Sequence, residues 1–172
     1  MESSKPVVEM FAQSASQFCE LIEQCDRYES GDFFHRVRMV LPLLYHQAMQ
    51  LPETSGDSQT LNRTFTHEDW CRILSSLSTK LGDCDTYWVI FDPTQLEPES
   101  PVCGSLNDDI ADIYRDLKNG LIHWAAGDEK LRESVVWEWK FSFETHWSYH
   151  LVNALRVMTW HVHNRGMDAT RF

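Results

Sequence analysis

Apolar residues recur at alternating spacings of three and four along most of this chain, and such a spacing lines one face of an α-helix. In the first such segment, about residues 5–28, the apolar face consists of Val8, Phe11, Ala15, Phe18 and Ile22. Further segments of this kind cover about residues 32–50, 66–82, 105–127 and 129–164. The sequence therefore predicts an all-α fold, a single-domain helical bundle of about five helices.

The last segment predicts an unusually long C-terminal helix, since an average helix has about 11–12 residues. Aromatic residues lie on more than one side of it, namely Trp137, Trp139, Phe141, Phe143, Trp147 and Trp160. A helix that is apolar on several sides is usually packed against several neighbours. We therefore expect this helix to be central in one domain over residues 1–172, with a core over about residues 5–165.

One segment does not follow the helical spacing. Residues 87–93, Tyr-Trp-Val-Ile-Phe-Asp-Pro, are rich in the β-branched and aromatic side chains that suit a strand. No partner strand is evident elsewhere, and a strand needs one. We therefore expect a buried helical or irregular segment that ends at Asp92 and Pro93, with loops over residues 52–65 and 94–104.

The charge balance excludes several classes of protein. The chain has 26 Asp and Glu against 15 Lys and Arg, a formal net charge of -11. Nucleic-acid binding needs clustered Lys and Arg, so this balance argues against it. No apolar run approaches the ~18 residues of a membrane span, and the N-terminal residues lack the pattern of a secretory signal. We expect no nucleic-acid or membrane partner.

The cysteines indicate a reducing compartment. Their number, 5, is odd, and no pair has the C-x-x-C spacing of a zinc or redox site. Cys19, Cys25 and Cys71 fall among apolar helix positions, where a free thiol packs as a small apolar side chain. We expect core cysteines and a cytoplasmic location.

Three aspartates crowd one helix. At 100° per residue, Asp109, Asp112 and Asp116 lie within about 60° of one another. Carboxylates this close repel unless a cation lies among them, and Mg²⁺ prefers oxygen ligands. The commoner explanation is a solvated acidic first turn that interacts with the helix dipole, with Arg115 and Lys118 as local partners.

Two histidines share a face of the predicted last helix. His146 and His150 are four residues apart among apolar neighbours, so their ring nitrogens need buried partners. They are candidate metal ligands that carboxylates of the Asp-rich helix would complete. The commoner explanation is that they are core histidines bonded to an Asp, a Tyr hydroxyl or a backbone carbonyl. The H-E-x-x-H pattern is absent, because Glu144 stands two residues before His146.

Several segments together resemble a known family. They are residues 41–45 (Leu-Pro-Leu-Leu-Tyr), 51–53, 87–93, 104–121, 143–147 (Phe-Glu-Thr-His-Trp) with His150, and 154–156. The sequence is similar, over about residues 7–160, to a bacterial family defined as a domain of unknown function, number 5063. The resemblance implies an all-helical cytosolic protein and brings no activity or substrate. Both the Asp-rich helix and the two histidines lie within it.

These residues support two main hypotheses of function. The first is a non-catalytic protein-binding module whose acidic surface recognises a partner with a basic surface. The second is a divalent-metal-dependent hydrolase acting on a phosphorylated or nucleotide substrate. In it the three aspartates hold Mg²⁺ or Mn²⁺, the two histidines serve as ligands or general base, and Arg115 pairs with a phosphate.

A third hypothesis makes the aspartates and histidines a buried polar network that fixes helix register. In that case replacing His150 by Leu would be tolerated or stabilising. No glycine-rich phosphate loop or dinucleotide fingerprint occurs, so the sequence points to no cofactor-binding residues. Of these hypotheses the sequence favours the non-catalytic protein-binding module, with the metal-dependent hydrolase as the alternative, and it indicates no oligomeric state.

Overall fold

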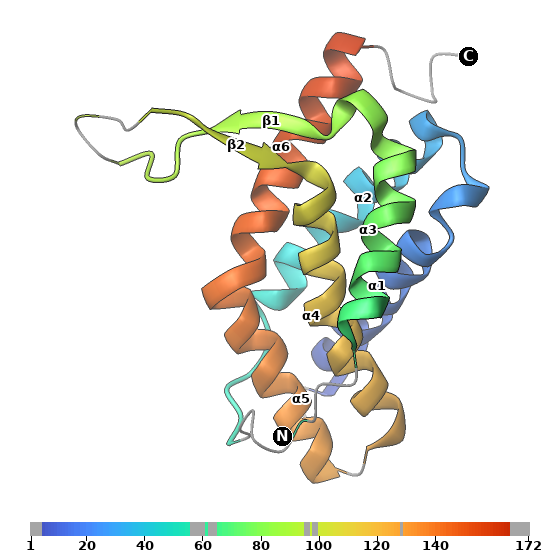
Figure 1. Ribbon diagram of the computed structural model, residues 1–172. Coiled ribbons are helices and arrows are strands. Elements are labelled where there is room, and N and C mark those ends of the chain that lie inside the picture. Colours follow the sequence, from blue (N-terminus) through green and yellow to red (C-terminus); the bar gives the residue numbers. More distant parts are fainter. Residues whose placement is uncertain are drawn as a thin grey trace.

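The computed structural model describes residues 5–55, 61, 65–94, 97, 100–127 and 129–165. Its helices are α1 (Lys5–Glu23), α2 (Ser30–Ala48), α3 (His67–Leu81), α4 (Leu106–Ala126), α5 (Glu129–Ser142) and α6 (Ser148–Arg165). Helix α4 packs against α1, α3, α5 and α6, and α2 packs against α1 and α6 (Figure 1). The predicted helical bundle is thus confirmed.

The long C-terminal helix is also confirmed, with one irregularity. Helix α5 continues into α6 through a π-helical turn, Phe143–Trp147, which has a wider turn than the flanking helices. Trp139 and Trp147 are fully buried, whereas Phe141 and Trp160 are about half exposed, at 48% and 55%. Part of the aromatic surface of the C-terminal helix therefore faces outward. The central position that we expected for this helix is taken by α4, which packs against four other helices.

The expectation of a buried helical or irregular segment over residues 87–93 was wrong for residues 87–89, which form a strand, whereas residues 90–93 are irregular. The segment is not buried either, because Trp88 and Phe91 are exposed. Strand β1 (Thr86–Val89) pairs antiparallel with β2 (Val102–Ser105), and the hairpin projects from the bundle (Figure 1). The sequence predicts a loop at the partner strand, because this strand is only four residues long and contains Gly104. Gly104 stands opposite Tyr87, and a Cβ there would lie 2.5 Å from the Tyr87 ring, so this pairing needs a glycine.

Asp85 joins the hairpin to the start of α4. Its Oδ1 accepts hydrogen bonds from the Ser105 hydroxyl at 2.9 Å and from the Asn107 N–H at 2.7 Å. The Ser105 Oγ in turn accepts from the Asp108 N–H, as the N-cap of α4. One carboxylate therefore fixes both the base of the hairpin and the first turn of the central helix.

We predict that Asp85→Ala lowers the free energy of unfolding by about 1–3 kcal/mol, because a buried backbone N–H and the capping serine both lose their acceptor. Urea denaturation measures this. Asp83→Ala is the matched control, since it removes the same charge two residues away from an exposed side chain. Equal destabilisation by both variants would contradict the assignment.

Two smaller expectations have different outcomes. Cys19 and Cys25 are buried as predicted, but Cys71 is exposed, because α3 buries the opposite face with Ile73, Leu77 and Leu81. The predicted loop over residues 52–65 lies largely outside the described residues. None of the helices that the structure describes is both long and apolar enough to cross a membrane.

Candidate metal centre

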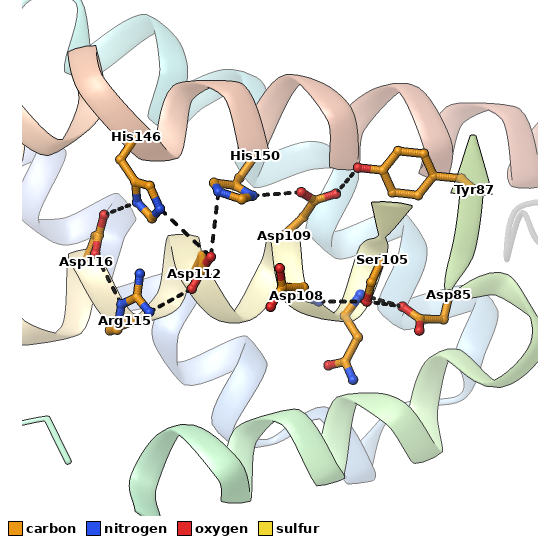
Figure 2. A network of polar contacts seen from close by, with 11 residues as sticks. Asp85, Tyr87, Ser105, Asp108, Asp109, Asp112, Arg115, Asp116, His146 and His150 are labelled. Carbon is orange, nitrogen blue, oxygen red and sulfur yellow. Dashed lines mark hydrogen bonds and ion pairs between the residues drawn. The ribbon is translucent and has the colours of Figure 1, made fainter. Parts of the chain in front are cut away.

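All five predicted metal-site residues converge between α4 and the C-terminal helix. Asp109, Asp112 and Asp116 lie along the face of α4 that meets this helix (Figure 2). His146 comes from the π-helical turn and His150 from the first turn of α6, with ring centroids 4.8 Å apart. Residues 30 or more positions apart in the chain are thus brought into one cluster.

His150 is oriented by a carboxylate. Its Nδ1 lies 2.8 Å from Asp109 Oδ1, and Asp109 Oδ2 accepts a hydrogen bond from the Tyr87 hydroxyl at 2.6 Å. An ionised carboxylate can only accept, so the proton of this contact sits on Nδ1. In the neutral imidazole, Nε2 is then left with a free lone pair.

His146 repeats the arrangement one turn earlier. Its Nδ1 lies 2.8 Å from Asp116 Oδ2, so the same reasoning leaves the lone pair on Nε2. Asp109 and Asp116 therefore hold the outer nitrogens of the two rings, and both inner nitrogens face Asp112 (Figure 2).

Asp112 is the carboxylate between the rings. Its Oδ2 lies 3.6 Å from His150 Nε2 and 3.9 Å from His146 Nε2, both longer than a hydrogen bond. Its Oδ1 forms an ion pair with Arg115 at 2.9 Å, and the residue is 8% exposed. The two Nε2 atoms and Asp112 Oδ2 are three electron-pair donors that lie within 4.8 Å of one another, with no hydrogen bond between them.

This geometry suits a metal ion. With metal–ligand lengths of about 2.0–2.1 Å, neighbouring ligands of a tetrahedral ion lie about 3.3–3.4 Å apart. The distances of 3.6 and 3.9 Å from Asp112 Oδ2 to the two Nε2 atoms are close to this value, and all three donor atoms, now within 4.8 Å of one another, would draw together on binding. Histidines that bind metals usually donate their other N–H to a carboxylate, which fixes the tautomer. Asp109 and Asp116 stand in that position here.

The charges of the cluster are unbalanced. Arg115 pairs with Asp112 and Asp116, whereas Asp108, Asp109, Asp112 and Asp116 are four carboxylates on one helix. Burial and the charge of Asp112 raise the pKa of Asp108 above its usual value. The hydrogen bond to Asp109 raises the pKa of His150, although burial opposes this. The site therefore attracts positive charge, from a proton or from a cation.

A cavity of about 420 Å³, large enough for a small molecule, opens beside this cluster. Arg115, Asp116 and His146 form its wall next to the cluster. Phe65, Asn119, Phe141 and Thr145 are among its other lining residues. A molecule in this cavity would lie next to His146.

The comparison with known families agrees with the sequence resemblance. The family model described as "Domain of unknown function (DUF5063)" matches residues 2–164. The chain belongs to the DUF5063 family. The crystal structure of protein BF1032 from Bacteroides fragilis is similar to it, with 26% identity, coverage of 90% of each chain and a TM-score of 0.77. No curated protein matches the chain.

The sequence of this DUF5063 protein did not point to Tyr87 as part of the cluster. Tyr87 reaches Asp109 from β1, and its hydroxyl is therefore part of the network although β1 itself was not predicted (Figure 2). The available signal was a tyrosine in a β-rich run followed, some residues later, by a short Val-Cys-Gly-Ser stretch directly before a capped helix. Arg115, predicted to meet a phosphate, is already paired with two carboxylates.

Proposed function

We propose that this protein binds a divalent transition-metal ion through Asp112, His146 and His150 and uses it in metal-dependent hydrolysis. One observation carries the proposal: both imidazoles bond a carboxylate through Nδ1 and turn Nε2 towards Asp112 Oδ2. A purely structural Asp–His pair needs no third carboxylate placed between two lone pairs. A cation at this point would relieve the repulsion between the Asp112 carboxylate and the lone pairs of the two Nε2 atoms.

The donor set favours particular metals. Two imidazole nitrogens and one carboxylate oxygen suit Zn²⁺, Fe²⁺, Co²⁺ or Mn²⁺ better than Mg²⁺, which prefers oxygen ligands and near-ideal octahedral geometry. Three protein ligands also leave coordination positions open, as in catalytic zinc sites. We therefore prefer these metals to the Mg²⁺ expected from three aspartate ligands, with Asp109 and Asp116 as outer partners.

Hydrolysis is the chemistry that an open site supports most directly. A metal ion lowers the pKa of a bound water and polarises the bond under attack. The neighbouring cavity offers room for a substrate, with Arg115 at its wall. The lining carries one cation, Arg115, against the carboxylates Asp116 and Glu138, so phosphate would bind there only with the help of the metal charge.

Metal binding is tested on the purified protein stripped with a chelator. After dialysis against Zn²⁺ or Co²⁺, elemental analysis should give one equivalent per chain, and the Tm should rise. At a free concentration of 100 Kd, the gain is about 2.7 kcal/mol. The same concentration of Mg²⁺ should give little change. No bound metal and no rise in Tm with Zn²⁺, Co²⁺, Mn²⁺ or Fe²⁺ would refute the proposal.

Hydrolysis needs its own assay. Metal-loaded protein is compared with stripped protein on phosphomonoesters, phosphodiesters and nucleoside triphosphates, with Asp112→Asn as the inactive control. We expect turnover that is lost on stripping and restored by metal. If the loaded protein binds metal but cleaves none of these compounds, the phosphate-directed hydrolase is rejected.

Raising the pH should weaken the metal-free fold and strengthen metal binding. The pKa of His150 in the folded protein is raised above its usual value of 6.5. The contribution of protonated His150 to stability is therefore fully present below pH 6.5 and is lost as the pH rises through the pKa of the folded state. Metal needs the neutral imidazole, so binding improves over the same range. Melting curves at about pH 6 and 8, with and without Zn²⁺, should show these opposite trends. In His150→Gln the trend of the metal-free protein should be smaller.

A second candidate function is the binding of another protein. The hairpin that projects from the bundle exposes Trp88 at 67% and Phe91 at 85% (Figure 1). Aromatic side chains are enriched in the buried centres of protein–protein interfaces. With a net charge of -11, the chain would favour a basic partner at low salt.

This candidate is tested by capture experiments with the wild-type protein and Phe91→Ser on separate resins. We expect a basic protein that binds wild type at low ionic strength, elutes with salt and binds the variant less. Recovery of no partner at low salt, or equal recovery on both resins, would contradict it.

A further inference from the structure

The hairpin reaches the candidate metal centre through the hydroxyl group of Tyr87. We propose that Tyr87 is a positioning residue of this centre, so that the β-hairpin sets the metal affinity of a site located on two helices. The inference rests on the proposed function and extends it to a residue outside the ligand set. On this proposal the hairpin is part of the metal site, because Tyr87 lies on β1.

Tyr87 fixes the carboxylate that orients His150. Its hydroxyl donates to Asp109 Oδ2 at 2.6 Å, while Asp109 Oδ1 accepts from His150 Nδ1 at 2.8 Å. Asp109 is 4% exposed, so little water can replace the phenol as donor. Without it, the carboxylate can rotate, and the Nδ1–H tautomer that leaves Nε2 for a metal loses its support.

The hairpin in turn fixes Tyr87. The ring lies against Gly104, its cross-strand partner, where a Cβ would come within 2.5 Å of the ring. The Arg156 guanidinium stands 5.9 Å from the ring centroid and donates to the Trp88 carbonyl at 3.1 Å, which ties β1 to α6. A change in the pairing of β1 and β2 would therefore move the hydroxyl away from Asp109.

The protein contains a matched control for this bond. Tyr114 also donates its hydroxyl to a carboxylate, Glu23 Oε1, at 2.8 Å. Burial, followed by the carboxylate contact, raises the pKa of both phenols. Glu23 contacts Lys118 and lies outside the histidine cluster. Tyr114→Phe thus removes an equivalent hydrogen bond without touching the metal ligands.

The test uses Co²⁺, whose visible absorption reports ligand geometry, on wild type, Tyr87→Phe, Tyr114→Phe and Gly104→Ala. We expect Tyr87→Phe to bind Co²⁺ about 10–100-fold more weakly, the usual cost of losing an outer partner, with a changed spectrum. Gly104→Ala should also weaken Co²⁺ binding and change the spectrum, because the added methyl group displaces the Tyr87 ring even though the Tyr87 hydroxyl remains. Tyr114→Phe should bind as wild type does, even if its Tm falls.

A second measurement needs no metal. In the stripped protein, ring ¹⁵N shifts report the tautomer of His150, and Tyr87→Phe should lower the share of the Nδ1–H form. If wild type binds Co²⁺ and Tyr87→Phe binds it equally well with an unchanged tautomer, Tyr87 is no positioning residue. If the tautomer changes but wild type binds no metal, the proposed function fails while the orientation of His150 by Tyr87 stands.

Discussion

Replacing Asp112 by Asn should abolish tight binding of Zn²⁺ and Co²⁺ while leaving the fold intact. The amide keeps the shape of the side chain but removes the anionic oxygen that faces both His Nε2 atoms. The loss should exceed the roughly 10–100-fold that removal of an outer hydrogen bond causes, because a ligand itself is lost. Isothermal titration calorimetry and the Tm shift with Zn²⁺ measure the effect.

The stability of the metal-free variant separates a metal ligand from a structural residue. Asn removes one of four crowded negative charges, so the free energy of unfolding should stay within about 1 kcal/mol of wild type or rise. Asp108→Asn, which makes the same charge change one turn away, should bind Zn²⁺ nearly as tightly as wild type. This pattern would show that Asp112 is needed for Zn²⁺ binding and does not stabilise the metal-free fold.

The structural hypothesis gives a different pattern. If the aspartates and histidines only fix helix register, then wild type gains no stability from Zn²⁺, and His150→Leu is tolerated or stabilising. For a metal site, His150→Leu also loses the Zn²⁺-dependent rise in Tm. Tight binding of Zn²⁺ by Asp112→Asn would remove Asp112 from the ligand set.

Gly120→Ala should destabilise the protein by about 2–4 kcal/mol, although alanine is the better helix former. A Cβ at Gly120 would overlap the Trp139 indole ring at Nε1. The ring is completely buried, donates to the Leu117 carbonyl at 3.3 Å, and meets Phe11 and Trp124. It therefore has no free space to move into, and overpacking together with a weakened buried hydrogen bond outweighs the gain in helix propensity.

Chemical denaturation of a double-mutant cycle tests this contact. Trp139→Phe removes the Nε1 atom and is itself destabilising, but it should make Gly120→Ala less costly than in the wild-type background. A cost for Gly120→Ala that is independent of residue 139, or a gain in stability, would contradict the close contact between α4 and α5.

Periodicity was enough to predict the bundle and the clustering of polar residues on its helices. Asp109, Asp112 and Asp116 repeat every three or four residues, and His146 and His150 are four apart, so each set shares a helix face. That the two faces meet depends on how α5 and α6 return along α4, which helix patterns do not determine. Helix patterns also do not predict that Asp112 faces the Nε2 atoms while Asp109 and Asp116 bond the Nδ1 atoms, because this depends on side-chain rotamers.

The hairpin could not be predicted, for a physical reason. Strand β2 has four residues without alternation and includes a glycine that makes room for Tyr87, so its local sequence resembles a loop. The pairing is stabilised by contacts with α4 and α6, through Asp85 and Arg156. A strand supported in this way carries little signal of its own, and Tyr87 was missed with it.

The placement of the three ligand atoms on two separate helices has a consequence for how the molecule opens. An ion bound to Asp112, His146 and His150 would act as a removable cross-link that closes the stretch of chain containing α5. Backbone amides of α5 could then exchange with solvent only when the ion leaves or the cross-linked segment opens locally. Hydrogen exchange in this helix would accordingly follow the occupancy of the metal more closely than the global stability of the bundle.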